Sequence, residues 1–153
     1  FPAVVPDEVQ GGATATRLLL EAGHRRIAFV NDAAPSPASV GRLAGYKAAL
    51  AQFDVDFDPS LVRSVTADQE GGYGAAAQVL ATGATGVFCH NDRTALGLYD
   101  ALRESGKRMP DDISVVGFDN QEVISAHMHP ALTTVGLPQY DLGVMGVRTL
   151  LRR

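Results

Sequence analysis

Short unbroken apolar runs alternate along the chain with longer segments in which apolar residues recur every three or four positions. Runs rich in β-branched residues are typical of buried strands, and the longer spacing is typical of helices that bury one face. The runs predict strands at 3–5, 26–30, 61–66, 86–90 and 113–118, and an extended segment at 130–138. The spaced segments predict helices at 12–22, 39–52, 70–81, 93–105 and 140–153.

Polar residues and glycines mark where these helices begin and end. Ser39 and Asp92 are predicted N-caps, while Gly23 and Gly106 are predicted stops. Strands that are separated by helices indicate βαβ units with right-handed crossovers. The predicted fold class is therefore α/β, with a Rossmann-like parallel sheet.

The run 113–118 ends in two polar residues, Asp119 and Asn120. In open α/β sheets, ligands bind at the carboxyl ends of the strands. A carboxylate at that place accepts hydrogen bonds from neighbouring hydroxyls. Gly117, inside the run, favours the close approach of a ligand or of another backbone. From the residues alone, either polar side chain can instead belong to an Asx turn or a helix cap.

Composition removes several functional classes. The chain has 153 residues and a net charge of −4, which argues against this segment gripping nucleic acid by itself. A single cysteine excludes an internal disulfide framework. The sequence has no nucleophile elbow, no phosphate-binding glycine loop and no histidine spacing typical of a metal site, so no enzyme activity, metal or cofactor is expected. No apolar run is long enough to span a membrane.

Five motifs occur in an order and spacing that resemble one family. They are AGHRRIAF at 22–29, RLAGY at 42–46, NDRTALG at 91–97, PDDISVVGFDN at 110–120 and PALTTV at 130–135. Together they resemble the effector-binding core of LacI/GalR-type transcription regulators. The resemblance covers nearly the whole chain.

The resemblance implies a fold like that of the periplasmic sugar-binding proteins, with two Rossmann-like subdomains and the ligand in the cleft between them. Residues 23–133 are expected to form one nearly complete subdomain, while 1–22 and 134–153 are expected to belong to the other. The family's DNA-binding head has no counterpart here, so the chain is expected to be the C-terminal portion of a larger repressor. Because a partial subdomain leaves apolar surface uncovered, we expect the segment alone to fold poorly.

The same resemblance implies roles for individual residues. Arg42, Asn91 and Asp119 are expected to bind the effector, with Asp68 as an additional polar contact. At the loop where the family often places an aromatic ring, this chain has Ala67, which weakens the case for ring stacking on the ligand. From its residue type alone, Arg42 can equally be a surface arginine or a partner of a nearby carboxylate.

The leading interpretation is the effector-sensing module of a cytoplasmic, homodimeric LacI-type regulator. Its partners are then a small molecule, by default a sugar, and operator DNA, which is bound through a head outside this chain. An alternative with the same fold is the periplasmic sugar-binding protein of an ABC transporter, which an upstream secretory signal would support. An enzyme on a Rossmann-like sheet is a third class, which the missing catalytic motifs disfavour. The identity of the effector, and whether it is an inducer or a corepressor, cannot be read from the residues.

Overall fold

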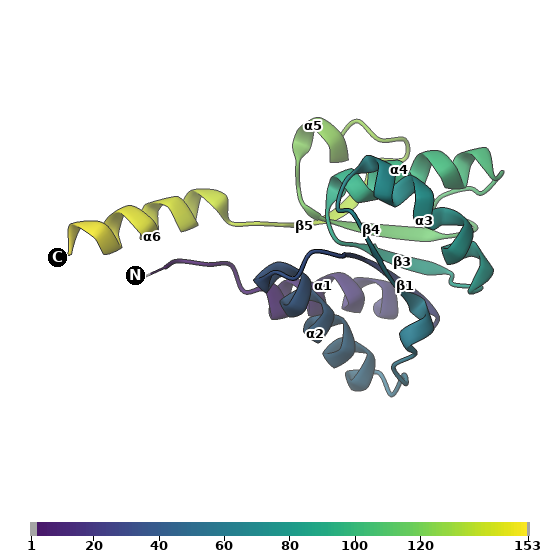
Figure 1. Cartoon of the computed structure of the whole chain (residues 1–153), viewed down its shortest axis with the longest axis horizontal. Coiled ribbons are helices and arrows are strands. Elements are labelled where there is room, and N and C mark those ends of the chain that lie inside the picture. Colours follow the sequence, from purple (N-terminus) through teal and green to yellow (C-terminus); the bar gives the residue numbers. More distant parts are fainter. Residues whose placement is uncertain (1–2, 153) are drawn as a thin grey trace.

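Residues 3–152 are described by a computed structural model, in which five parallel strands form one sheet with helices on both faces (Figure 1). The strands are β1 (Ile27–Asp32), β2 (Val62–Val65), β3 (Gly86–Cys89), β4 (Ser114–Asp119) and β5 (Thr133–Gly136). The helices are α1 (Glu8–Glu21), α2 (Pro37–Gln52), α3 (Gln69–Ala81), α4 (Asp92–Glu104), α5 (Glu122–Ser125) and α6 (Gln139–Leu151), with a 3₁₀ turn, η1, at Pro59–Leu61. The predicted fold class is confirmed.

The strand order in the sheet is β2-β1-β3-β4-β5, and every neighbouring pair is parallel. From β1 the chain first moves outward to β2 and then returns to the other side of β1 to form β3. This reversal places a topological switch point between the carboxyl ends of β1 and β3, which is where such sheets bind ligands. All five strands end at the same edge of the sheet, because all five are parallel.

The sheet is buried on both faces, which explains the unbroken apolar runs in the sequence. On one face Phe29 of β1 stacks on Phe88 of β3 with 4.4 Å between ring centroids, under α1 and α2. On the other face Ala28 and Val30 of β1 pack under α3 and α4. Successive residues of one strand thus serve two separate cores.

Helices α1 and α2 pack closely because glycines stand at their contact. A Cβ atom at Gly45 would lie 2.0 Å from the carbonyl oxygen of Val9, and one at Gly12 would lie 2.4 Å from the carbonyl oxygen of Arg42. Any side chain at either position would push the helices apart. This packing brings the beginning of α1 next to Arg42 on α2.

Two elements of this sheet extend beyond the predicted subdomain of residues 23–133. Helix α1 lies within 1–22, yet its apolar face, with Ala15 and Leu19, packs in the same core as Phe29. Strand β5 likewise pairs with β4, although it extends beyond residue 133. Helix α1 covers one face of this sheet, and β5 is its edge strand next to β4. The division of the chain between two subdomains stays a prediction.

Helix α6 differs from the rest of the chain. It leaves the sheet after β5 and projects away from it (Figure 1), and none of its described side chains is buried. Its assignment to a second subdomain stays a prediction. Helices α1 to α4 cover both faces of the sheet, whereas α6 exposes a row of large apolar side chains.

Several local predictions were wrong. Residues 3–5 form no strand, since no neighbouring strand pairs with them. The N-cap of α2 is Ser36, which forms a capping box with Ser39, and the N-cap of α4 is Asn91, one residue before the predicted Asp92. Helix α5 was not predicted, because four residues are too few to show a helical period. The predicted end of the last helix, Arg153, lies outside the described residues.

Candidate functional site

Polar side chains gather at the carboxyl edge of the sheet, next to the switch point. Arg42 comes from α2, which follows β1, while His90 and Asn91 follow β3, and Asp119 ends β4. Asp68 stands after β2 as the N-cap of α3, where its side chain accepts a hydrogen bond from the backbone N–H of Gly71 at 2.8 Å. The topology therefore brings all four predicted site residues to one edge.

Arg42 is the centre of this cluster, although its side chain is only 5 % exposed. Its Nε donates to Glu8 Oε2 at 2.8 Å, and its Nη1 donates to the carbonyl oxygen of His90. Its Nη2 lies 3.6 Å from Asp119 Oδ1, and the guanidinium carbon lies 3.7 Å from the centroid of the Phe118 ring. Arg42 thus joins two carboxylates, a strand end and an aromatic face.

Glu8 is the functional candidate that the sequence analysis missed. It belongs to the first turn of α1 and lies 34 positions from Arg42 in the chain. Neither a local motif nor the resemblance marked it. A surplus carboxylate at a helix start, just after the capping Asp7, was the one available signal, and many solvent-exposed helices show the same pattern.

The side chain of Asp119 faces Arg42, and its backbone has a conformation that residues other than glycine rarely adopt. Its φ is 100°, and that of Asn120 is 55°, so two successive residues lie in the left-handed region. Such conformations cost energy and persist where surrounding contacts hold them, often at binding sites. Burial raises the pKa of Asp119, while the nearby Arg42 charge acts in the opposite direction. The side chain of Asn120 turns towards α5, where its Oδ1 accepts a hydrogen bond from Ser125 Oγ at 3.1 Å.

The contacts that hold this turn come from Asp92, which is fully buried. Its carboxylate accepts a hydrogen bond from the backbone N–H of Gln121 and another from Thr134 Oγ1, both at 2.6 Å. A Cβ at Gly117 would lie 2.4 Å from Asp92 Oδ1, so this approach requires a glycine. Burial raises the pKa of Asp92, and the hydrogen bonds that its carboxylate accepts lower it in part. Asp92 is thus an anchor for the loop that carries Asp119, not a helix cap.

Asn91 is engaged inside the protein. Its Oδ1 accepts from Thr94 N at 2.9 Å and from Thr94 Oγ1 at 2.8 Å, and its Nδ2 donates to the carbonyl oxygen of Ala67 at 3.0 Å. It therefore starts α4 and ties the loop after β2 to the loop after β3. Its expected contact with an effector stays a prediction.

His90 is buried beside this cluster and shares its polar network. Its Nδ1 lies 3.0 Å from Asn31 Oδ1, and Asn31 Nδ2 donates to the carbonyl oxygen of Ser39. Because the amide oxygen of Asn31 can only accept, Nδ1 of His90 carries the proton. Burial, together with the Arg42 charge, lowers the pKa of His90 to about 4. His90 is therefore neutral at pH 7.

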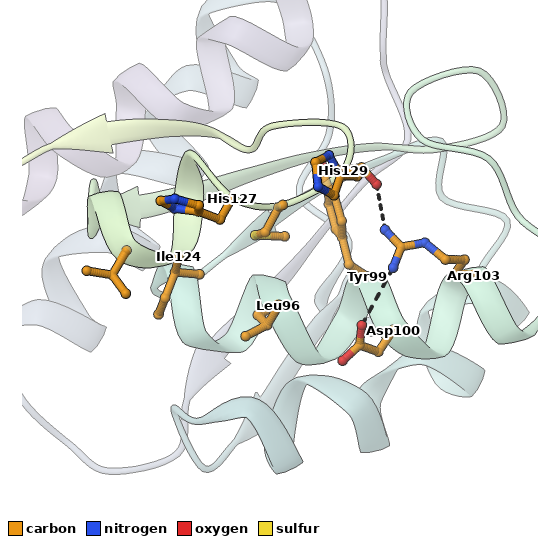
Figure 2. Close-up of a pocket in the computed structure, with 9 residues that line it drawn as sticks. Leu96, Tyr99, Asp100, Arg103, Ile124, His127 and His129 are labelled. Atoms are coloured by element: carbon orange, nitrogen blue, oxygen red, sulfur yellow. Dashed lines mark hydrogen bonds and ion pairs between the residues drawn. The ribbon is translucent and has the colours of Figure 1, made fainter.

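A separate hollow of about 200 Å³ lies between α4 and residues 123–129 (Figure 2). Leu96, Ile124 and His127 line it, and Arg103 crosses its rim, where it donates to the carbonyl oxygen of His129 and pairs with Asp100. No residue of the Arg42 cluster lines it. It is smaller than the ligand pockets of most proteins, so we assign the site to the strand ends.

Residues 3–152 contain neither a cluster of metal ligands nor a helix that could span a membrane. No group of three or more histidine, cysteine, aspartate or glutamate side chains is arranged there to hold a metal ion. In that same part of the chain, no helix combines the length and the apolar character needed to cross a membrane.

Comparison with known proteins shows one consistent relationship. The family model described as a periplasmic binding protein-like domain matches residues 16–153. The ribose operon repressor of Haemophilus influenzae is 34% identical over 152 residues, which are 98% of this chain and 46% of that protein. This chain therefore spans about half the length of the curated relatives it matches.

Solved structures agree in fold and in coverage. The complex of the transcriptional regulator CelR with cellobiose has a TM-score of 0.90 at 34% identity, over 97% of this chain and 46% of that chain. A LacI family regulator from Enterococcus faecium with bound ribose has a TM-score of 0.89 at 36% identity, over 97% of this chain and 55% of that chain. Each of these three relatives is a transcription regulator by name.

Proposed function

The chain belongs to the periplasmic binding protein-like domain family, in the form found in LacI-type regulators, and from this we propose that it binds the small-molecule effector of such a regulator. The observation that carries the proposal is the Arg42–Asp119 pair at the switch point of the sheet. It places a fork of donors beside a carboxylate acceptor where open α/β sheets bind ligands. Support for a sugar as the ligand comes from two relatives, since CelR is solved with cellobiose and the Enterococcus faecium regulator with ribose.

In this proposal the effector is a sugar or a sugar-like polyol. Asp119 accepts hydrogen bonds from neighbouring hydroxyls, and the Nη2 of Arg42 donates to a ring or hydroxyl oxygen. Asn91 and Asp68 are the two further contacts on the loops after β3 and β2. Asp92 does not contact the ligand in this proposal. Its hydrogen bonds to Gln121 and Thr134 hold the loop that carries Asp119.

The effector acts by shifting a population. A ligand that binds better to one angle between two subdomains favours that angle, to the extent of its difference in affinity. We propose that the apolar side chains of α6 pack in the second subdomain, and that the angle controls how a DNA-binding head meets its operator. We propose further that the regulator is a homodimer in the cytoplasm, since twofold operators match twofold proteins.

Calorimetric titration with ribose and cellobiose tests the proposed ligand class. We expect saturable binding of at least one sugar by the wild-type chain and a loss of at least about tenfold in Asp119→Asn, because an amide can accept at one atom only. The control is Asp111→Asn, which changes the same charge at an exposed position. Equal affinity in both variants would refute the role of Asp119.

The alternative, a sugar-binding protein of a transporter, shares the fold and the site. It loses support because the relatives reported above are transcription regulators. A band-shift assay with the full-length protein and operator DNA separates the two. Release of DNA on addition of the sugar supports the regulator.

A further inference from the structure

Glu8 forms a short, shielded ion pair in the middle of the candidate site. Its Oε2 lies 2.8 Å from Arg42 Nε, and the two side chains are only 14% and 5% exposed. Asp119 Oδ1 approaches the same guanidinium from Nη2 at 3.6 Å. Two partly buried carboxylates therefore share one buried cation.

Two of the five N–H groups of Arg42 are hydrogen-bonded in this arrangement, and Nη2 faces a carboxylate. An arginine holds a phosphate or carboxylate best with two parallel N–H groups along one edge of its planar fork. Here Nε donates to Glu8, Nη1 donates to the carbonyl oxygen of His90, and Nη2 faces Asp119. The Phe118 ring covers one flat face of the group. An anion that approaches the Nε–Nη2 edge consequently has to displace Glu8, and one that approaches Nη1 and Nη2 together meets the Asp119 carboxylate.

The space for Glu8 is built into the packing of α1 on α2. Asp7 already caps α1, with its side chain accepting from Gln10 N at 2.9 Å, so the helix does not need Glu8 for that purpose. A Cβ at Gly41 would lie 2.5 Å from the Cβ of Glu8. The glycine that admits Glu8 thus immediately precedes the arginine that Glu8 contacts.

The other charged groups that act on this cluster are carboxylates as well. Asp92 raises the pKa of Asp119, and Asp32 acts on His90 together with Glu8. His90 itself is neutral at pH 7. A negatively charged ligand beside Arg42 would therefore stand among like charges that water screens poorly.

We propose that Glu8 is a specificity-determining residue that closes Arg42 to anions, so that the cleft takes uncharged hydroxylated ligands and rejects phosphorylated or carboxylated ones. This inference rests on the proposed function and narrows its ligand class. An uncharged polyol leaves the Glu8–Arg42 pair intact and bonds to Nη2 and to the oxygens of Asp119. A phosphate group has to displace Glu8 or lie against both carboxylates.

The test uses inorganic phosphate as the probe and the Nε–H resonance of Arg42 in ¹H–¹⁵N NMR as the reporter, at constant ionic strength. The variant Glu8→Gln keeps the shape of the side chain and removes its charge. We expect it to bind phosphate at Arg42 at least about tenfold more tightly than the wild type. Glu8→Asp, which keeps the charge, and Glu21→Gln, which removes an exposed charge from the other end of α1, are expected to exclude phosphate like the wild type.

Glu8→Met provides a second uncharged variant in case Glu8→Gln does not fold. Equal phosphate affinity in the wild type and in the folded uncharged variant, whether strong or undetectable, overturns the inference. A gain of equal size in Glu21→Gln also overturns it, because the effect would then come from net charge alone.

Parallel titrations of the wild type with ribose and ribose 5-phosphate separate this inference from the proposed function. Binding of ribose without ribose 5-phosphate supports both. If ribose 5-phosphate binds as tightly as ribose, the role of Glu8 is refuted and the sugar-binding proposal stands. If neither sugar binds while the uncharged Glu8 variant gains phosphate, the proposed function fails and the role of Glu8 stands.

Discussion

Arg42 connects three parts of the molecule through a single side chain: the start of α1, the end of β3 and the end of β4. It is buried, and its charge is matched by carboxylates on both sides. A residue in this position serves the fold and the site together. Its removal is therefore expected to affect both stability and binding.

Arg42→Ala is expected to lower the free energy of unfolding by about 3 kcal/mol, because it leaves the Glu8 and Asp119 carboxylates in a shielded place without a counter-charge. Effector binding should be lost as well. Urea denaturation measures the first effect and calorimetry the second. The control is Arg93→Ala on the exposed side of α4, for which we expect a change within about 0.5 kcal/mol. Similar losses in both variants would contradict the special position of Arg42.

His90 makes the stability of the chain depend on pH. Its pKa is about 4 in the folded protein against 6.5 as the ordinary value, so between these values the unfolded chain binds a proton that the folded chain does not. The free energy of unfolding should therefore fall as the pH drops from 6.5 towards 4, by on the order of 3 kcal/mol in all. Urea titrations at several pH values measure this, and His90→Asn should show a flatter dependence over the same range.

Asp92 and Asp119 act on the pH dependence of stability in the opposite direction. Burial raises both pKa values above the ordinary 3.8, so the folded chain binds protons before the unfolded chain does. Their contribution to stability is therefore present in acid and is lost as the pH rises through the raised values. In His90→Asn this opposing slope should become visible. A variant curve with the same steep fall as the wild type would contradict the assignment to His90.

At the scale of single residues, the sequence placed Asp119 at the end of a strand because an apolar run ends directly before it. It could not separate Asn91 from Asp92, since both residue types cap helices and they are adjacent. Only the fold shows that Asp92 turns inward to Gln121 and Thr134. Glu8 was out of reach, because its role depends on a partner 34 positions away and on the packing of two helices.

At the scale of elements, the contact of α1 with α2 is set by small residues. Gly12 and Gly45 allow the two backbones to approach, and this approach brings Glu8 to Arg42. Strands were predicted well because sheets buried on both faces need unbroken apolar runs. Residues 3–5 show the limit of that signal, since an apolar run forms a strand only where a partner strand is present.

Gly45→Ala is expected to destabilise the chain by about 2 kcal/mol or more, because its methyl group would meet the backbone of Val9 at 2.0 Å. The matched substitution is Gly74→Ala on the exposed side of α3, where nothing lies within 4 Å of the added Cβ. There we expect a gain of about 0.5 to 1 kcal/mol, because alanine favours the helix. Thermal denaturation compares the two. A gain at both positions would show that the close packing of α1 on α2 is unnecessary.

At the scale of the whole molecule, the described residues form one sheet that is covered on both faces and one helix, α6, that buries no side chain. The apolar side chains that α6 exposes include Tyr140, Met145, Val147 and Leu150. Such a surface is typical of a contact with another part of a protein. The resemblance assigned residues 134–153 to the other subdomain, whereas β5 pairs with β4 in this sheet.

A chain that ends at Leu137 should keep the stability of the intact chain to within about 1 kcal/mol, since α6 buries no side chain. It should also bind less of a fluorescent hydrophobic dye. A shorter chain that ends at Ala131 also lacks β5 and the Thr134 contact with Asp92, and it should unfold or melt without cooperativity. If the chain that ends at Leu137 loses as much stability as the chain that ends at Ala131, then α6 packs on the sheet in solution and the prediction is wrong.

Three helices of the sheet begin at capping residues that follow a strand end: Ser36, Asp68 and Asn91. Two of these, Asp68 and Asn91, are also proposed to contact the ligand. A substitution there that changes ligand preference would therefore also remove a helix cap. Loss of a cap costs about 1 kcal/mol, a noticeable part of the margin by which a domain stays folded. Lineages that drift towards a new ligand are therefore expected to accept changes at Glu8 and Asp119, which cap nothing, more readily than at Asp68 and Asn91. In this architecture the substitutions that can change ligand specificity are limited by the stability of the fold as well as by the chemistry of the ligand.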